Sequence, residues 1–227
     1  MPSPARPRGR DGSVRRERLL RAALELYASQ GLLGTTTPAL AARAGVAEGT
    51  IYRHFRSKEH LYNEVYRRAV RWALDQLRSV EVEAPRRVPD RLAALARRLL
   101  EGAERDPATL RMLLGVPGAG VLDESSRTLE REFKDALVQL VAAGKSDGLI
   151  RAGPAELWAS VWLALVSHAA DRVCRGEWTA AHTQAALVLE AAWQAIAAPS
   201  PGSTSAGGEP PVPAPSGPSG SGHPPAV

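Results

Sequence analysis

A short stretch near residue 50, with the sequence GTIYRHF, concentrates side chains suited to contacting nucleic acid. The hydroxyl groups of Thr50 and Tyr52 can donate hydrogen bonds to phosphate oxygens. Arg53 can reach a phosphate or present its guanidinium to a guanine edge. Gly49 has no side chain and would let the start of a helix approach a backbone closely. These residues predict a surface that contacts a polyanion.

The spacing of the apolar residues predicts which face of this stretch is exposed. Ile51 and Phe55 are four residues apart, so on a helix they lie on one side, where they would pack with Leu40. The polar residues then turn outward, and His54 and Lys58 flank the same surface. Taken singly, each is more typical of a solvated helix face, but their combination favours DNA.

Two short helices joined by a tight turn would position these side chains. In TTTPALAARAG, Thr37 is the expected N-cap and Pro38 the first helical residue, and Gly45 ends the helix. A second helix over 47–55 follows at once. This is the helix-turn-helix pattern, in which the second helix enters the major groove and the positive end of the first can receive a phosphate.

The segment from Arg15 to about Tyr66, centred on TTTPALAARAGVAEGTIYRHFRSKEHLYNEV, resembles the DNA-binding domain of the tetracycline-repressor (TetR) family. The resemblance implies a role for eight residues. Contacts to the DNA backbone are implied for Thr37, Thr50, Tyr52, His54 and Lys58, and contacts to bases for Glu48, Gly49 and Arg53. Pro38 stands where some members carry a polar or basic side chain, and Glu48 would either accept from a cytosine amine or cap the helix.

The rest of the chain predicts an all-α fold. Helical periodicity runs from Val14 to Ala198, with Gly31 ending the first helix and Ser57 capping the fourth. Further helices are expected near 88–105, 107–115, 122–147, 154–174 and 179–197, the last with Thr179 as its cap. The predicted organisation is a disordered basic arm (1–12), a helix-turn-helix domain (13–60), a larger helical ligand-binding and dimerisation domain (61–198) and a disordered Pro/Gly/Ser tail (199–227).

Charge supports this division. The chain has 227 residues and a formal net charge of +5. Residues 1–70 contain thirteen Arg and Lys against six Asp and Glu, a net of +7, and the remainder contains sixteen against eighteen, a net of −2. Positive charge at one end is expected for a module that meets a polyanion. The arm before the first helix could follow a minor groove or act only as a solubilising segment.

A homodimer is expected because a single helix in the major groove buries too little DNA surface for specific binding. The last helix is apolar over most of its circumference, which predicts cover on more than one side. Its expected interface face comprises Val188, Leu189, Ala192, Trp193 and Ile196, extended by Leu187 and Ala191. Together with the helix before it, this would form a four-helix interface, as the resemblance also implies. The alternative is that the last helix is the centre of a monomeric bundle.

An effector pocket in the larger domain is the second expectation, because the resemblance implies one among the middle helices. Candidate lining residues are Trp72, Leu110, Met112, Leu113, Phe133, Leu137, Trp158, Trp162 and His168. Sparse charge among them suggests an apolar effector of unknown identity. Residues of these types at helical spacing are more often core residues than ligand contacts, and His168 is likewise more typical of a hydrogen-bonded core histidine than of a ligand anchor.

Other classes of protein are disfavoured. The chain has no glycine-rich phosphate loop, nucleophile elbow or cluster of ligands at metal spacing, so we expect neither an enzyme nor a cofactor. Its single cysteine, Cys174, excludes an internal disulfide and suits a small buried apolar residue better than a redox sensor. Without an apolar stretch of membrane-spanning length or a signal sequence, the expected location is the cytoplasm.

The predicted function is that of a dimeric transcriptional regulator that binds double-stranded DNA. We expect a repressor that a small-molecule effector releases from a palindromic operator. The alternative is a helix-turn-helix protein that acts through protein partners or binds DNA without an effector.

Overall fold

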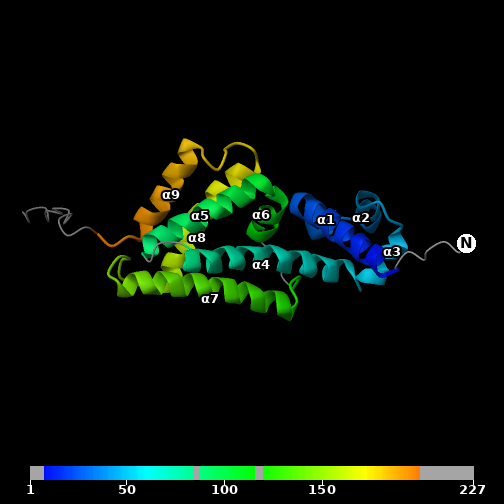
Figure 1. Ribbon diagram of the computed structural model, residues 1–227, viewed down its shortest axis with the longest axis horizontal. Helices are drawn as coiled ribbons and strands as arrows, with labels where there is room; N and C mark the ends of the chain where they lie inside the picture. The colour runs from blue at the N-terminus through cyan, green and yellow to red at the C-terminus, as the bar shows by residue number, and fades with distance from the viewer. Residues whose placement is uncertain (1–7, 84–86, 116–119, 200–227) are drawn as a thin grey trace, which may run out of the picture.

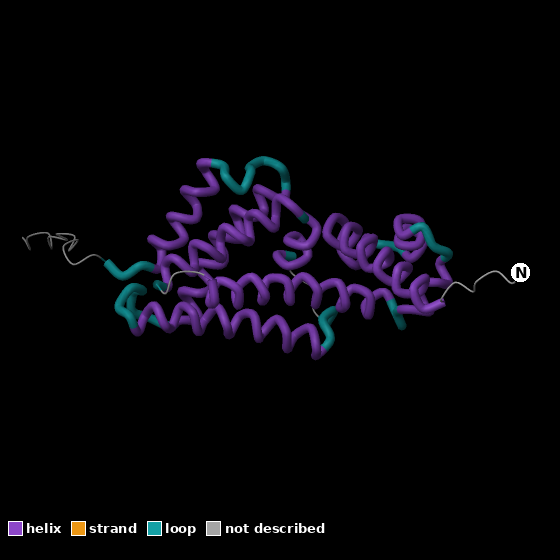
Figure 2. Tube along the Cα trace, in the orientation of Figure 1, coloured by secondary structure: helices purple, strands orange, loops and turns teal. Residues whose placement is uncertain are grey.

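The computed structural model describes residues 8–83, 87–115 and 120–199, and within these ranges the regular structure is entirely helical (Figures 1 and 2). The all-α prediction is confirmed. The helices are α1 (Arg8–Gly34), α2 (Thr37–Ala44), α3 (Glu48–His54), α4 (Lys58–Glu83), α5 (Val88–Arg105), α6 (Pro107–Leu114), α7 (Glu124–Ser146), α8 (Ala155–Cys174) and α9 (Thr183–Ile196).

Helices α1, α2 and α3 form a small lobe at the N-terminal end of an elongated molecule (Figure 1). The apolar stripe of α1, including Leu20 and Tyr27, is buried together with Leu40 of α2 and Ile51 of α3. Burial of these side chains sets the orientation of α3, because seven residues are too few for a helix to be stable alone. The turn between α2 and α3 depends on Gly45, whose φ of 63° lies in the left-handed region.

Helix α4 connects this lobe to the larger helical bundle and then runs alongside α7 (Figure 1). Its first turn is capped by Ser57, whose Oγ accepts a hydrogen bond from the backbone N–H of His60 at 3.1 Å, as predicted. Arg68 of α4 binds both carboxylate oxygens of Glu17 of α1, at 2.6 and 2.7 Å. This bidentate pair links α4 to α1 in addition to their apolar contacts.

The larger bundle contains α5 to α9 around the distal part of α4. Helices α5, α6 and α7 all pack on α4, and α8 packs against α5, α6, α7 and α9. Gly102 of α5 lies against the Trp72 ring of α4 so closely that a Cβ would overlap it. After α9 the chain turns back, and Ala197 pairs with Ile150 in an antiparallel bridge that holds the end of α9 beside the α7–α8 turn.

Several predicted boundaries are wrong. The cap of α2 is Thr36, whose hydroxyl accepts from the N–H of Ala39, so that Thr37 is already helical. The cap of α9 is His182, whose Nδ1 accepts from the N–H of Gln184, and Thr179 precedes the helix. The interruption at Gly31 is present as a φ of 70°, but helical turns continue to Gly34.

The expected arm and tail fall largely outside the described part of the chain. Helix α1 begins at Arg8, so residues 8–12 of the expected arm form its first turns. Residues 1–7 and 200–227, which hold the rest of the arm and nearly all of the tail, are not described. None of the described helices combines the length and hydropathy needed to cross a bilayer.

Candidate nucleic-acid interface

The outward face of α3 is the candidate site. Tyr52 is 58% exposed, whereas Ile51 and Phe55 beside it are 2% and 1% exposed. Glu48, Gly49 and Arg53 are also exposed, and Thr50 is half-buried. The helix therefore turns its apolar residues into the lobe and leaves hydroxyl and guanidinium groups at the surface, which is the arrangement that groove recognition needs.

Two hydroxyl groups from different helices lie side by side at this surface. The Thr37 Oγ1 and the Tyr52 hydroxyl are 3.3 Å apart, although their residues are fifteen positions apart in sequence. Either oxygen can donate to the other, which leaves the second hydrogen free for a phosphate. The pair also ties the start of α2 to α3, so it fixes the geometry that it offers to a ligand.

Gly49 leaves an empty space beside α3. A Cβ built at this position meets no heavy atom within 4 Å, and its φ is outside the left-handed region that favours glycine. Neither packing nor backbone conformation therefore requires glycine here, in contrast to Gly45. The missing side chain allows another molecule to approach the helix start.

Lys58 has a structural contact that the sequence did not predict. Its Nζ donates a hydrogen bond to the carbonyl of Thr35 at 2.8 Å, and its own carbonyl accepts from the Tyr27 hydroxyl at 3.1 Å. The ammonium group keeps two further hydrogens for a phosphate. His54, half-buried at the end of α3, lies with its ring centroid 6.3 Å from that of Phe55.

Three arginines near the site were missed. Arg18 donates to the carbonyl of Gly45 in the turn, at 3.1 Å. Arg43 donates to Glu25, which also accepts from Arg21, so that α1 and α2 are joined through one carboxylate. Arg56 is exposed directly after α3 and adds a positive charge. The partners of Arg18 and Arg43 lie 27 and 18 positions away in sequence, so only the general excess of arginine signalled those two residues.

A second candidate site is a pocket of about 350 Å³ between α4, α6, α7 and α8. Leu110 and Phe133 line it, and so does Leu113. Its few polar groups include Lys134 and Glu130, which pair at 2.7 Å, and Ser167. Burial is the main cause that raises the pKa of Tyr66, another lining residue, so its hydroxyl stays protonated. The pocket is predominantly apolar with a small polar group set, as expected for a small-molecule site.

The other predicted lining residues lie elsewhere. Trp72 packs against Gly102, and Met112 and Leu137 are buried in the core. Trp158 donates its indole N–H to the carbonyl of Ala152, and His168 lies edge-on to Trp178 with ring centroids 6.0 Å apart. Trp162 lines a different groove, between α5 and α9. The structure thus brings together only Leu110, Leu113 and Phe133 from the predicted set.

Helix α9 presents three distinct faces. Ala185, Ala192 and Ile196 are buried within the same chain, and Leu189 and Trp193 line the groove beside α5. Four of the seven residues expected at a subunit interface are therefore turned inward or into that groove: Leu189, Ala192, Trp193 and Ile196. The outer face carries Leu187, which is 64% exposed, with Ala191 exposed and Val188 half-buried.

Cys174 is buried, and its Sγ lies 3.7 Å from the carbonyl of Pro107. Burial raises the pKa of its thiol to about 11, so the reactive thiolate is scarce at neutral pH. This agrees with a packing role. Within the described ranges, no three His, Cys, Asp or Glu side chains are grouped to hold a metal ion.

Comparison with known proteins places this site in context. Residues 19–65 match the family described as bacterial regulatory proteins, tetR family. The nucleoid occlusion factor SlmA of Marinobacter nauticus is 32% identical over 139 residues, which cover 61% of this chain and 70% of that protein. The transcriptional repressor KstR2 of Mycolicibacterium smegmatis is 36% identical over 66 residues, which cover 29% of this chain and only 32% of that protein.

The fold extends beyond these matched segments. A TetR family transcription regulator from Marinobacter aquaeolei superposes with a TM-score of 0.72 over 85% of this chain and 100% of that one, at 20% identity. At this identity the similarity concerns the fold. It includes the larger bundle as well as the helix-turn-helix.

Proposed function

Because the chain belongs to the TetR family of bacterial transcriptional regulators, we propose that it is a homodimeric repressor, that α3 reads a palindromic operator, and that an apolar effector releases it. The observation that carries the proposal is the outward face of α3, where the paired Thr37 and Tyr52 hydroxyls, open Gly49 and exposed Arg53 adjoin one another.

The residues of this face would divide the work of binding DNA. Thr37, Thr50, Tyr52, His54 and Lys58 would contact phosphates, and Glu48, Gly49 and Arg53 would lie nearer the bases. Phosphate contacts set the register of the protein on the duplex, and base contacts set the sequence. The relatives bear the names of a transcriptional repressor and a nucleoid occlusion factor. Of these two outcomes of DNA binding, repression is the one that we propose for this chain.

Dimerisation would use the outer faces of α8 and α9. Leu157 on α8 and Leu187 on α9 are among the few large apolar side chains exposed in the described residues. Val161 and Ala164 share the face of Leu157, and Ala191 shares that of Leu187, at the spacing of successive helical turns. Pairing of these faces around a two-fold axis would set two α3 helices at the separation of successive major grooves.

Release by effector would run through α6. This helix supplies Leu110 and Leu113 to the pocket of about 350 Å³. At its start, Asp106 accepts a hydrogen bond from Arg21 of α1 at 2.9 Å. This bond connects α6 directly to the lobe formed by α1, α2 and α3, called the reading lobe below. An effector that binds more tightly when α6 is shifted would favour a different orientation of the α1–α3 lobe. The loss in operator affinity would be limited by the difference between the effector's affinities for the shifted and unshifted states.

The proposal is tested by binding genomic DNA fragments to the purified full chain and measuring affinity against salt concentration. For a protein that binds a DNA groove, the logarithm of the affinity falls linearly with the logarithm of the salt concentration. Tyr52→Phe should weaken binding to every fragment by roughly threefold to tenfold, as expected for one lost hydrogen bond. Arg53→Ala should change which sequence is preferred.

Arg97→Gln is the matched control, because it removes one arginine charge far from α3, on the exposed face of α5. It should leave DNA affinity nearly unchanged. Retention of no genomic fragment at low salt, or equal effects of Arg97→Gln and Arg53→Ala on sequence preference, would contradict the proposal.

A further inference from the structure

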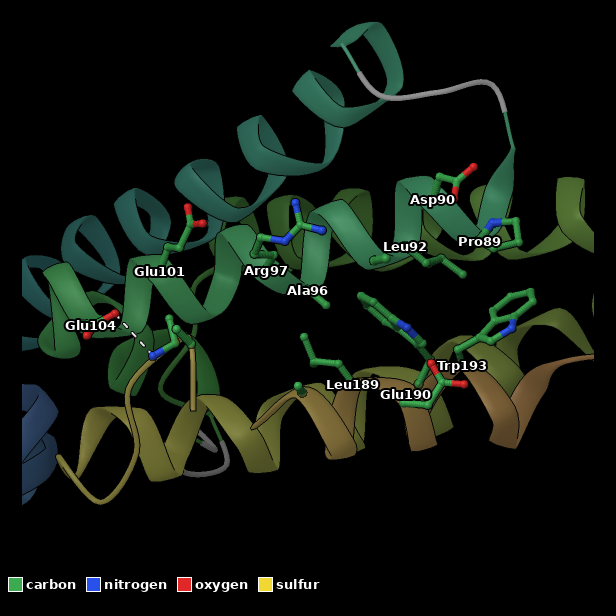
Figure 3. A pocket seen from close by; sticks show the side chains of 15 residues that line it. Pro89, Asp90, Leu92, Ala96, Arg97, Glu101, Glu104, Leu189, Glu190 and Trp193 are labelled. Carbon is green, nitrogen blue, oxygen red and sulfur yellow. Dashed lines mark hydrogen bonds between the residues drawn. The ribbon is translucent and has the colours of Figure 1, made fainter. Parts of the chain in front are cut away.

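A groove of about 740 Å³ lies between α5 and α9 and is separate from the pocket already described (Figure 3). Trp162 from α8, which is 2% exposed, lines it together with Leu92 of α5 and Leu189 and Trp193 of α9. None of the residues that the structure describes lines both cavities. The volume is in the range of drug-sized ligand sites.

Four of the residues that line this groove are exposed carboxylates. Asp90, Glu101 and Glu104 come from α5 and Glu190 from α9, whereas Arg97 is the one cationic residue among the described residues that line the groove (Figure 3). In this view Glu101 and Glu104 lie toward one end of α5 and Asp90 toward the other, with Asp90 and Glu101 drawn on the side of α5 away from α9. Glu190 lies on α9 beside Trp193. The groove is therefore acidic although the whole chain is basic.

These carboxylates have no ion-pair partner among the described residues, which is also true of Asp75, Glu81 and Glu156, whereas several other carboxylates of the chain are paired. Glu17, Glu25 and Asp123 each form an ion pair with arginine. In the described part of the chain, none of the four groove carboxylates has a cationic nitrogen within 4.0 Å. Glu104 accepts only from the N–H of Ala180 at 3.3 Å, and Glu190 from the side-chain amide of Gln194 at 2.7 Å. The four carboxylates that line this cavity thus have no cationic partner within the described ranges.

We propose that this groove binds a hydrophobic organic cation, a molecule with a flat apolar body and a protonated or quaternary amine. The apolar body would displace water from Leu92, Leu189 and the indole rings, and aromatic rings add a further attraction for a cation. The carboxylates would neutralise the ammonium group. Neutral or anionic molecules of the same shape would lack this second contribution, so selectivity rests on charge.

The groove stays open in the proposed dimer. At about 100° per residue, the groove residues Leu189 and Trp193 lie nearly opposite the outer residues Leu187 and Ala191 on α9. A partner packed on the outer face would not cover the groove. The site is independent of DNA binding, so it can be tested whether or not the chain proves to be a repressor.

The test uses the full chain and two probes that share a ring system and differ in charge, 1-naphthylmethylammonium and 1-naphthalenemethanol, with binding measured by isothermal titration calorimetry. We expect the cation to bind at least about tenfold more tightly than the alcohol, a difference of about 1.4 kcal/mol. The preference should shrink as salt is raised.

Variants locate the site. The double variant Glu101→Gln/Glu190→Gln should weaken the cation at least about tenfold and leave the alcohol unchanged. Glu156→Gln is the control, because Glu156 is an exposed carboxylate of α8 outside the groove. Ala93→Trp, which places a bulky ring in the groove, should abolish binding of both probes. Arg97→Gln should tighten the cation, a gain that misfolding cannot produce.

Equal affinity of the two probes would overturn the proposal. So would an effect of Glu156→Gln as large as that of the double variant, or failure of Ala93→Trp to reduce binding, since either result places the cation elsewhere on the protein.

Discussion

Two helical glycines of this chain differ in whether the fold requires them. A Cβ at Gly102 would overlap the Trp72 ring, so the contact between α4 and α5 requires that glycine. A Cβ at Gly49 would meet nothing. Two glycines in helices thus serve different ends: one permits close packing inside the protein, and the other leaves room for something outside it.

This contrast gives a prediction. Gly49→Leu should leave the melting temperature unchanged or raise it slightly, because leucine favours a helix by up to about 1 kcal/mol over glycine. The same variant should lose at least about tenfold in affinity for a retained genomic fragment, because the side chain fills the space next to the groove. Thermal melting and gel shift measure the two effects.

Gly102→Ala is the matched comparison. It should lower the free energy of unfolding by about 1–3 kcal/mol through overpacking, with DNA affinity of the folded protein preserved. If Gly49→Leu binds DNA as the wild type does, the start of α3 does not approach the duplex.

Helices in the reading lobe are joined by charged side chains as well as by the core. Glu25 of α1 accepts from Arg43 of α2 at 2.7 Å and from Arg21 at 2.9 Å. The hydrogen bond from Arg43 is the main cause that lowers the pKa of Glu25 below its ordinary value, with Arg21 acting in the same direction against desolvation. The folded state therefore favours the carboxylate form.

A pH dependence follows from this pKa. Because the folded-state pKa is lowered, the stabilisation is present at neutral pH and is lost as the pH falls through that value. Glu25→Gln should lower the free energy of unfolding by about 0.5–1 kcal/mol at pH 7, as expected for a surface pair. Chemical denaturation at several pH values should show the difference from wild type shrinking below about pH 4. A difference that stays constant on acidification would exclude the ion pair as its cause.

Helices were the most predictable feature of the sequence. Apolar periodicity located them because burial of one helix face is a local signal. Caps were less predictable: in the run Thr35, Thr36 and Thr37 the residue types are identical, and only the position of the Ala39 N–H selects Thr36. His182 was missed because an imidazole nitrogen acts as the cap acceptor of α9.

The outward residues of α3 were predictable for the same reason, since Ile51 and Phe55 fix its inner face. The lining of the pocket was not. Trp158, Trp162 and His168 share α8, yet each has a different neighbour, which depends on how distant helices pack around it. Unpaired carboxylates of the α5–α9 groove likewise become visible only when the positions of all arginines are known.

The whole molecule is elongated, with the reading lobe at one end and the outer faces of α8 and α9 in the larger bundle (Figure 1). Positive charge is concentrated in the first 70 residues. A subunit of this shape cannot place two α3 helices on one duplex by itself. In the proposed function, the dimer interface on α8 and α9 sets the spacing of the two α3 helices, although it lies far from the α1–α3 lobe. A substitution at that interface should therefore weaken DNA binding without altering any DNA contact.

Leu187→Glu tests this relation. Leu187 is 64% exposed on the outer face of α9, so a charge there should leave the subunit folded but be buried against its copy in a dimer. We expect the dimer dissociation constant to rise at least about tenfold in sedimentation velocity, and operator affinity to fall with it. Val82→Glu is the control, because Val82 is 86% exposed on α4, outside this face. A stable Leu187→Glu dimer would move the interface away from α9, and a monomer with unchanged operator affinity would show that one reading helix suffices.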